Sequence, residues 1–165
     1  MIKYTWSYNK PNIVKQLFNG NNFNTDTRTT TLTGTFTTDT TATLKAFDGT
    51  NWKESTTSLK FYPGLYYGVS ATLPDNLKSS EIISFSRKLQ SSRNTTITVN
   101  CTTDKHIYIC IPYSYGPAVF KVGGFEGGFE LVNDNYSFTR YNTVIRYRIY
   151  RSDYGSLGNT TITIS

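Results

Sequence analysis

The chain has 165 residues, a net charge of +6 and only 17% charged residues. Its longest apolar run is a handful of residues, short of the roughly 20 that a transmembrane helix needs, and no signal-peptide pattern opens the chain. Thirteen tyrosines and ten phenylalanines argue against disorder. Abundant Thr, Tyr, Phe and Ile, with few Ala, Leu and Glu, favour strands over helices. The composition predicts an all-β protein.

The first 63 residues hold short strand patterns with a turn about every ten residues, which is typical of a β-sandwich. Asn19-Gly20 and Asp48-Gly49 are the strongest turn signals. Gly34 lies within a threonine-rich strand pattern and predicts a bulge or a close backbone approach. The predicted strands are 3–9, 27–37, 42–47 and 58–62. Pro63-Gly64 marks a break, so we predict one module over 1–63 and a second over 64–165.

The second module is also predicted to be a β-sandwich, with one short helix over about 79–86. Ser79 or Ser80 can cap this helix, and Glu81 is favourable in its first turn. Apolar residues recur there with helical spacing at Ile82, Phe85 and Leu89. The nearly continuous apolar run 106–113 predicts a central strand, and 137–151 has the longest strand pattern. The other predicted strands are 65–70, 96–101 and 161–165.

The two cysteines, Cys101 and Cys110, flank a predicted hairpin whose turn is 102–105. If Cys101 pairs with His106, the sulfurs share a face but lie four residues apart along the strand. At about 3.4 Å per residue this separation is beyond disulfide reach. We therefore expect two reduced core thiols and a protein made in a reducing cytoplasm. A zinc site is excluded, because it needs four ligands and the chain has two Cys and one His.

The sequence holds no recognisable catalytic constellation. His106 has no matching nucleophile motif, and a single histidine is more often structural. The chain has eleven acidic residues, and most of its aspartates lie in turn contexts that explain them without catalysis. There is no phosphate-binding loop, dinucleotide fingerprint or EF-hand loop. We expect a non-enzymatic protein without catalytic, metal-binding or cofactor-binding residues.

Two features are candidate assembly contacts. Arg146 and Arg148 alternate with apolar residues and so share one face of a strand, which we interpret as a solvated face rather than a nucleic-acid surface. The near-repeat Gly-Gly-Phe-Glu at 123–130 carries Phe125 and Phe129 in a segment that its glycines make adaptable. Either this segment is an irregular loop that presents a Phe to a partner, or one Phe enters the core.

Motifs along both modules resemble those of tailed-bacteriophage virion proteins, often tail fibre or minor structural proteins. The first module resembles the Ig-like module of these proteins, and the second resembles their C-terminal β-module. The first set of motifs is Trp6 to Lys10, Leu17 to Gly20, Arg28 to Gly34 and Thr43 to Gly49. The second set is Tyr66 to Ser70, Lys78 to Ile82, Ile111 to Gly116, Tyr147 to Ser152, Gly158 and Thr161 to Ile164. Because the resemblance to the Ig-like module begins near the first residue, we expect no trimerising shaft or attachment segment before it.

The resemblance implies a structural protein of the virion: a tail, collar, baseplate or fibre component, made in the bacterial cytoplasm. Its expected partners are other virion proteins and copies of itself, without nucleic acid or membrane insertion. One alternative is a capsid decoration protein. The other is a carbohydrate-binding module for a host surface glycan, because aromatic rings on β-sandwiches can stack on sugars. Its candidate residues are Trp6, Trp52, Tyr66 and Tyr67, for which core and interface packing is the alternative interpretation.

Overall fold

The computed structural model describes residues 1–9, 12–33, 38–140 and 143–165 and is all-β. The chain divides into two compact units, Met1–Phe61 and Tyr62–Ser165, each of which is described by itself. The predicted bulge at Gly34 lies outside the described residues.

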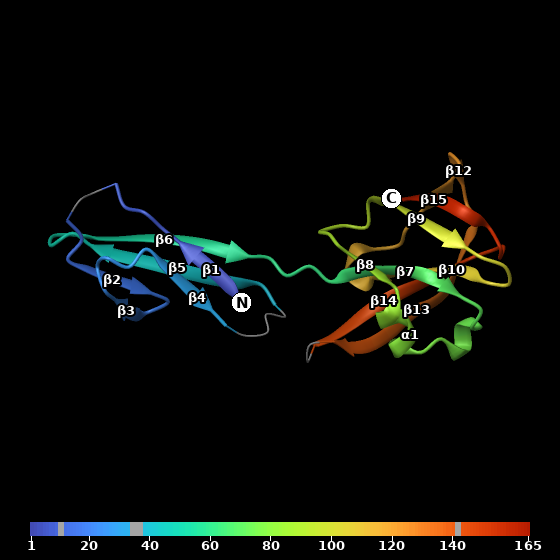
Figure 1. Ribbon diagram of the computed structural model, residues 1–165, viewed down its shortest axis with the longest axis horizontal. Helices are drawn as coiled ribbons and strands as arrows, with labels where there is room; N and C mark the ends of the chain where they lie inside the picture. The colour runs from blue at the N-terminus through green and yellow to red at the C-terminus, as the bar shows by residue number, and fades with distance from the viewer. Residues whose placement is uncertain (10–11, 34–37, 141–142) are drawn as a thin grey trace. The chain divides into compact units, whose positions relative to one another are not determined.

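The first unit contains a four-stranded antiparallel sheet and a two-stranded one (Figure 1). The order in the larger sheet is β3-β2-β5-β6, and β1 pairs with β4 in the smaller. Phe18 is the aromatic centre of this unit and contacts the rings of Tyr4, Trp6 and Phe23. The strands are β1 Ile2–Thr5, β2 Lys15–Phe18, β3 Asn21–Phe23, β4 Thr29–Leu32, β5 Thr40–Phe47 and β6 Trp52–Leu59.

Both predicted turns of this unit join paired strands. Asn19 and Gly20 have φ of 50° and 81°, as a type I′ turn between β2 and β3 requires. Asp48 begins the turn between β5 and β6, where its side chain accepts the backbone N–H groups of Thr50 and Asn51. The strand predicted over 58–62 is instead β6, which begins at Trp52, because Thr and Ser extend the pairing with β5 without any apolar alternation.

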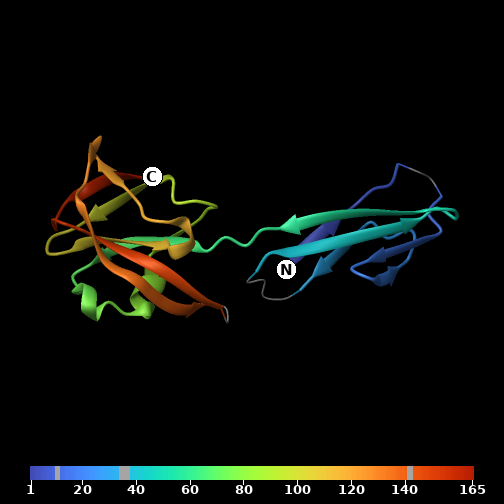
Figure 2. The ribbon, with the colours of Figure 1, turned by 180° about the vertical axis from the view of Figure 1, so that it is seen from behind.

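The second unit has a five-stranded sheet of order β13-β14-β10-β7-β8 and a four-stranded sheet of order β12-β11-β15-β9 (Figures 1 and 2). Every pairing in both sheets is antiparallel. The first sheet uses β7 Gly64–Ser70, β8 Ser86–Leu89, β10 His106–Pro112, β13 Phe129–Arg140 and β14 Thr143–Ser152. The second uses β9 Thr95–Cys101, β11 Phe120–Val122, β12 Phe125–Glu126 and β15 Gly158–Ile164. The helical segments are η1 Pro74–Asn76, α1 Ser79–Ser84 and η2 Tyr113–Tyr115.

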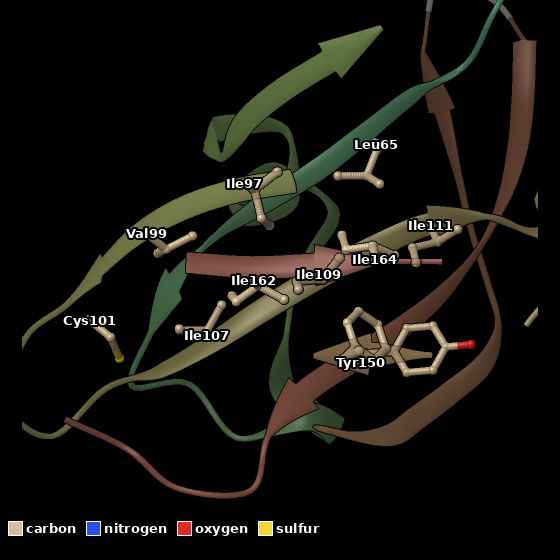
Figure 3. Packing of buried hydrophobic residues seen from close by; sticks show 11 residues of the cluster. Leu65, Ile97, Val99, Cys101, Ile107, Ile109, Ile111, Tyr150, Ile162 and Ile164 are labelled. Carbon is tan, nitrogen blue, oxygen red and sulfur yellow. The ribbon is translucent and has the colours of Figure 1, made fainter. Parts of the chain in front are cut away.

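The two sheets of this unit bury an aliphatic core between them (Figure 3). The five-stranded sheet contributes Leu65, Ile107, Ile109, Ile111 and Tyr150, and the four-stranded sheet contributes Ile97, Val99, Cys101, Phe120, Ile162 and Ile164. A second core covers the opposite face of the five-stranded sheet, where Leu77 and Ile82 pack on Tyr66 and Tyr108. Because β10 is buried on both faces, its sequence is an unbroken apolar run, and its predicted central position is confirmed.

The predicted short helix is present, but its cap is different. The N-cap residue is Lys78, without a side-chain capping bond, and Ser79 instead hydrogen-bonds the hydroxyl of Tyr136. Glu81 does lie in the first turn, and Ile82 is the buried contact. The helical spacing fails at Leu89, which lies in β8 and is exposed.

The predicted hairpin between the cysteines is wrong. β9 pairs with β15 in one sheet, whereas β10 pairs with β7 and β14 in the other, so the link between them crosses from sheet to sheet. Cys101 lies between the sheets, and Cys110 lies on the opposite face of the five-stranded sheet. Both thiols are free and buried, as predicted, although the register that led to this prediction does not exist.

The long strand pattern 137–151 also divides. β13 ends at Arg140, and β14 begins at Thr143 and runs back along it. Sequence alternation continues through both strands, so the apolar pattern does not show where one strand ends and the next begins.

Candidate functional site

The tyrosines proposed for sugar stacking belong to the second unit's own packing. Tyr66 is 0% exposed and makes edge contacts with the rings of Phe138 and Tyr147. Its hydroxyl accepts a hydrogen bond from Arg140. Tyr67 is partly buried against the core between the sheets. A sugar platform needs an accessible ring face, so Tyr66 is excluded as a glycan-stacking residue.

Trp6 is built into the first unit in a similar way. Its ring stacks on Phe18 with a centroid separation of 5.6 Å and meets the edge of Phe23 at 6.2 Å. Its indole Nε1 donates to the side-chain oxygen of the buried Gln16 at 3.1 Å, and Tyr8 donates to the same oxygen at 2.6 Å. Gln16 thereby ties the N-terminal segment to β2, and Trp6 is a packing residue.

Trp52 is the exposed member of the four, with 46% of its surface accessible. The centroid of its ring lies 5.2 Å from that of Phe47, its neighbour across the hairpin that joins β5 and β6. Trp52 lines a shallow pocket of about 420 Å³ together with Leu17, Lys45, Lys53 and Glu54. Lys45 and Glu54 form an ion pair of 2.8 Å there. An accessible indole beside charged hydrogen-bonding groups has the composition of a weak sugar subsite.

The two candidate arginines of β14 have different environments. Arg148 is buried, contrary to the solvated face predicted for it, because its Nε donates to Asp134 at 2.7 Å and its Nη1 to the carbonyl of Tyr113 at 2.8 Å. Its guanidinium also lies 3.8 Å from the centroid of the Tyr113 ring. Arg146 is exposed, donates to Asn135 at 2.7 Å and lies 4.4 Å from the same ring. Arg146 can reach a partner, whereas Arg148 holds η2 against the sheet.

The glycine segment forms a hairpin rather than the irregular loop expected as one interpretation. Gly123 and Gly124 have φ of 58° and 88°, so they make the type I′ turn between β11 and β12. Phe125 follows this turn and is 82% exposed. Phe129 packs on the core, with its ring centroid 4.7 Å from that of Phe120. The two copies of one tetrapeptide thus have different environments, and only Phe125 is available for contact with a partner.

His106 and the neighbouring serine do not form a catalytic pair. The His106 Nδ1 lies 2.8 Å from the carbonyl oxygen of Ser152 rather than from its hydroxyl. The Ser152 hydroxyl is buried, donates to the carbonyl of Tyr154 and accepts the N–H of Ile107. Burial raises the pKa of the Cys110 thiol, which disfavours the reactive thiolate. Within the described residues, no group of three or more His, Cys, Asp or Glu is placed to hold a metal ion.

No family model, curated protein or solved structure matches the chain. In the described part of the chain, no helix has the length and apolar character needed to cross a membrane.

Sequence reasoning missed most of the strand β6, since the strand predicted over 58–62 overlaps only its C-terminal end. All eight of its residues are exposed. It carries no apolar alternation, so the pattern that locates half-buried strands could not find it. The available signals were the high strand propensity of Trp52, Thr56 and Thr57 and the strong turn signal at Asp48-Gly49 just before the strand.

Proposed function

We propose that this chain is a non-enzymatic structural protein of a tailed-bacteriophage virion, a tail, collar, baseplate or fibre component that acts through protein–protein contacts. The proposal joins the order of virion-like motifs in the sequence to one structural observation, the exposed Phe125. Its partners are other virion proteins and copies of itself, and its location is the virion, after synthesis in the bacterial cytoplasm.

Phe125 carries the proposal because its exposure is maintained by the backbone. The Gly123-Gly124 turn and the pairing of β12 with β11 hold the ring at the end of a hairpin, away from the core. Aromatic side chains are enriched at protein interfaces, and a contact residue that is already ordered loses little entropy on binding. The motif residues 66–70, 147–152 and 161–164 support the same role, since they lie in the framework strands β7, β14 and β15.

The test is the location of the chain. Particles from cells that carry the gene are purified on a density gradient and probed with an antibody raised against the chain. We expect the chain to band with the particles at a constant number of copies. A chain that stays in the soluble lysate contradicts the virion role, and head and tail fractions distinguish a tail component from a capsid decoration protein.

Variants then test the contact residue. Phe125→Ala should reduce the number of copies per particle, while Leu131→Ala, which also removes an exposed apolar side chain, should not. Equal incorporation of both variants would remove Phe125 from the interface.

A carbohydrate-binding role is the second candidate, favoured by the accessible Trp52 beside Lys45 and Glu54. A glycan array with the purified chain tests it. Trp52→Ala should abolish a specific signal, whereas Trp52→Phe should retain part of it because a stacking face remains. Binding that survives Trp52→Ala would assign the sugar to another surface.

A further inference from the structure

The strand β6 is an open edge of the first unit's larger sheet. It pairs over all eight residues with β5, and no strand in the described part of the chain pairs with its other side. All eight of its residues are exposed, although Trp52 contacts the ring of Phe47 and Glu54 pairs with Lys45. Figures 1 and 2 show it as the last strand on one side of this sheet.

Hydrogen bonds of β5 show which residues of β6 direct their backbone groups outward. The carbonyl of Phe47 accepts the N–H of Val14 at 2.8 Å, and the carbonyl of Thr43 accepts the N–H of Asn19 at 2.9 Å. Both residues therefore direct their backbone N–H and C=O groups toward β2. Their cross-strand neighbours, Trp52 and Thr56, must direct theirs to the free edge.

The pairing of β5 with β6 has no register shift, so the alternation holds along the whole strand. Trp52, Glu54, Thr56 and Ser58 thus offer both N–H and C=O to an incoming strand. This row of groups is the template that strand addition requires.

Several other edge strands in the described part of the chain are short, bulged or contacted by a lysine side chain. β13 has two register shifts, and β12 has two residues. β8 has four residues and includes Arg87 and Lys88. In β9, the carbonyl of Thr96 accepts the amino group of Lys88 at 3.1 Å. Natural edge strands use these devices to prevent pairing, and β6 has neither a bulge nor a proline and only one lysine, Lys53.

We propose that β6 pairs antiparallel with β6 of a second copy of this chain, about a two-fold axis at Thr56. In an antiparallel pair, a residue whose N–H and C=O point toward the partner strand must face a residue of the same kind. In β6 such residues alternate with those directed toward β5, so the two-fold axis must pass through a residue and not between two residues. Charge then selects which residue. An axis at Glu54 places this carboxylate opposite its own copy, and an axis at Ser55 leaves the two carboxylates diagonal to each other; both are unfavourable.

An axis at Thr56 gives complementary neighbours. Glu54, which also pairs with Lys45 at 2.8 Å, then faces Ser58 of the second copy. It lies diagonal to Lys60 of that copy, which also pairs with Asp39 at 2.7 Å, and the symmetry repeats this contact. Lys53 faces the apolar Leu59 of the second copy, along which its aliphatic stem can pack. An axis at Thr57 also brings Glu54 to Lys60, but it shortens the paired stretch of β6. The axis at Thr56 therefore combines the longer ladder with opposite charges.

This inference deepens the proposed assembly function, since it names a second copy of the chain as one partner. It is tested on the purified chain and needs no particle. A failure of β6 pairing would leave the virion location untouched, and a failure of virion location would leave the pairing measurable.

Sedimentation equilibrium of the full chain, from micromolar to millimolar concentration, measures the association. We expect a monomer–dimer equilibrium that Thr56→Pro abolishes. The proline removes an N–H that faces the free edge and no bond to β5, so tryptophan fluorescence and circular dichroism should stay those of the folded chain. Thr56→Val keeps the N–H and should still dimerise. A chain that is monomeric throughout, or a dimer that survives Thr56→Pro, overturns the proposal.

Cross-linking tests the register and does not depend on the proline variant. Residues that share the two-fold axis in a hydrogen-bonded pair have Cα atoms about 5.5 Å apart, within disulfide range. Mild oxidation of Thr56→Cys should therefore give covalent dimers, and the native thiols are buried and should not interfere. Thr57→Cys should cross-link at least about tenfold more slowly, because Thr57 faces Ser55 of the second copy and the two Thr57 positions are diagonal neighbours about 7–8 Å apart. Faster cross-linking of Thr57→Cys contradicts the axis at Thr56.

Charge variants test the diagonal pair. Glu54→Lys and Lys60→Glu should each weaken dimerisation about five- to tenfold, because two symmetric pairs become repulsive. The double variant restores opposite charges and should recover most of the affinity. No recovery would show that Glu54 and Lys60 do not meet across the interface.

Discussion

Phe129→Ala should destabilise the second unit by about 2–3 kcal/mol. Truncation of a fully buried Phe costs about 3–5 kcal/mol, and Phe129 is only partly buried, so a smaller value is expected. Part of the loss comes from the ring contact between Phe129 and Phe120, because an aromatic pair contributes about 0.5–1.5 kcal/mol beyond its burial. The Phe120 ring also contacts Tyr150, with a centroid separation of 4.8 Å. For a domain of this size the melting temperature should fall by about 10–20 °C.

Phe125→Ala is the matched control, because it removes the same side chain from the same Gly-Gly-Phe-Glu tetrapeptide. Because Phe125 is 82% exposed, Phe125→Ala should change the free energy of unfolding by no more than about 0.5 kcal/mol. Both tryptophans lie in the first unit, so their fluorescence reports that unit, while tyrosine absorbance reports mainly the second. In urea, Phe129→Ala should shift the tyrosine transition alone. Equal shifts for the two variants would refute the assignment of Phe129 to the core.

Three further predictions concern thiols and charges. Both cysteines should resist iodoacetamide at about pH 8 in the folded chain and react in urea, as mass spectrometry would show; rapid labelling of the native protein would contradict their burial. Asp134→Ala should cost about 1–2 kcal/mol in urea unfolding, because Arg148 stays buried without its carboxylate, and Asp134→Asn should cost less, since an acceptor remains. The hydrogen bond from Lys60 holds the pKa of Asp39 below its ordinary value, so the associated stability is present above the unfolded-state pKa and is lost as pH falls through the folded one. Lys60→Gln should raise that pKa in an NMR titration, and an unchanged value would show that Lys60 has no effect on it.

The sequence by itself determined the class of fold and several local elements. High strand propensity and scarce helix formers made the chain all-β, because these preferences act residue by residue. Turns such as Asn19-Gly20 and Asp48-Gly49 were readable because they depend on a few adjacent residues. The apolar run of β10 predicted a central strand, because a strand that is buried on both faces has few positions for polar side chains.

Only the tertiary structure decided which strands pair and which aromatic rings are accessible. Cys101 and Cys110 flank a short link that could close a hairpin, yet β9 and β10 belong to different sheets, because long-range pairing with β15 and β14 replaces the local one. Phe125 and Phe129 share one sequence context and differ in burial, because the hairpin directs one ring outward and β13 brings the other to the core. The open edge of β6 likewise depends on which strands lie beside it, and that is a property of the folded sheet that local sequence does not encode.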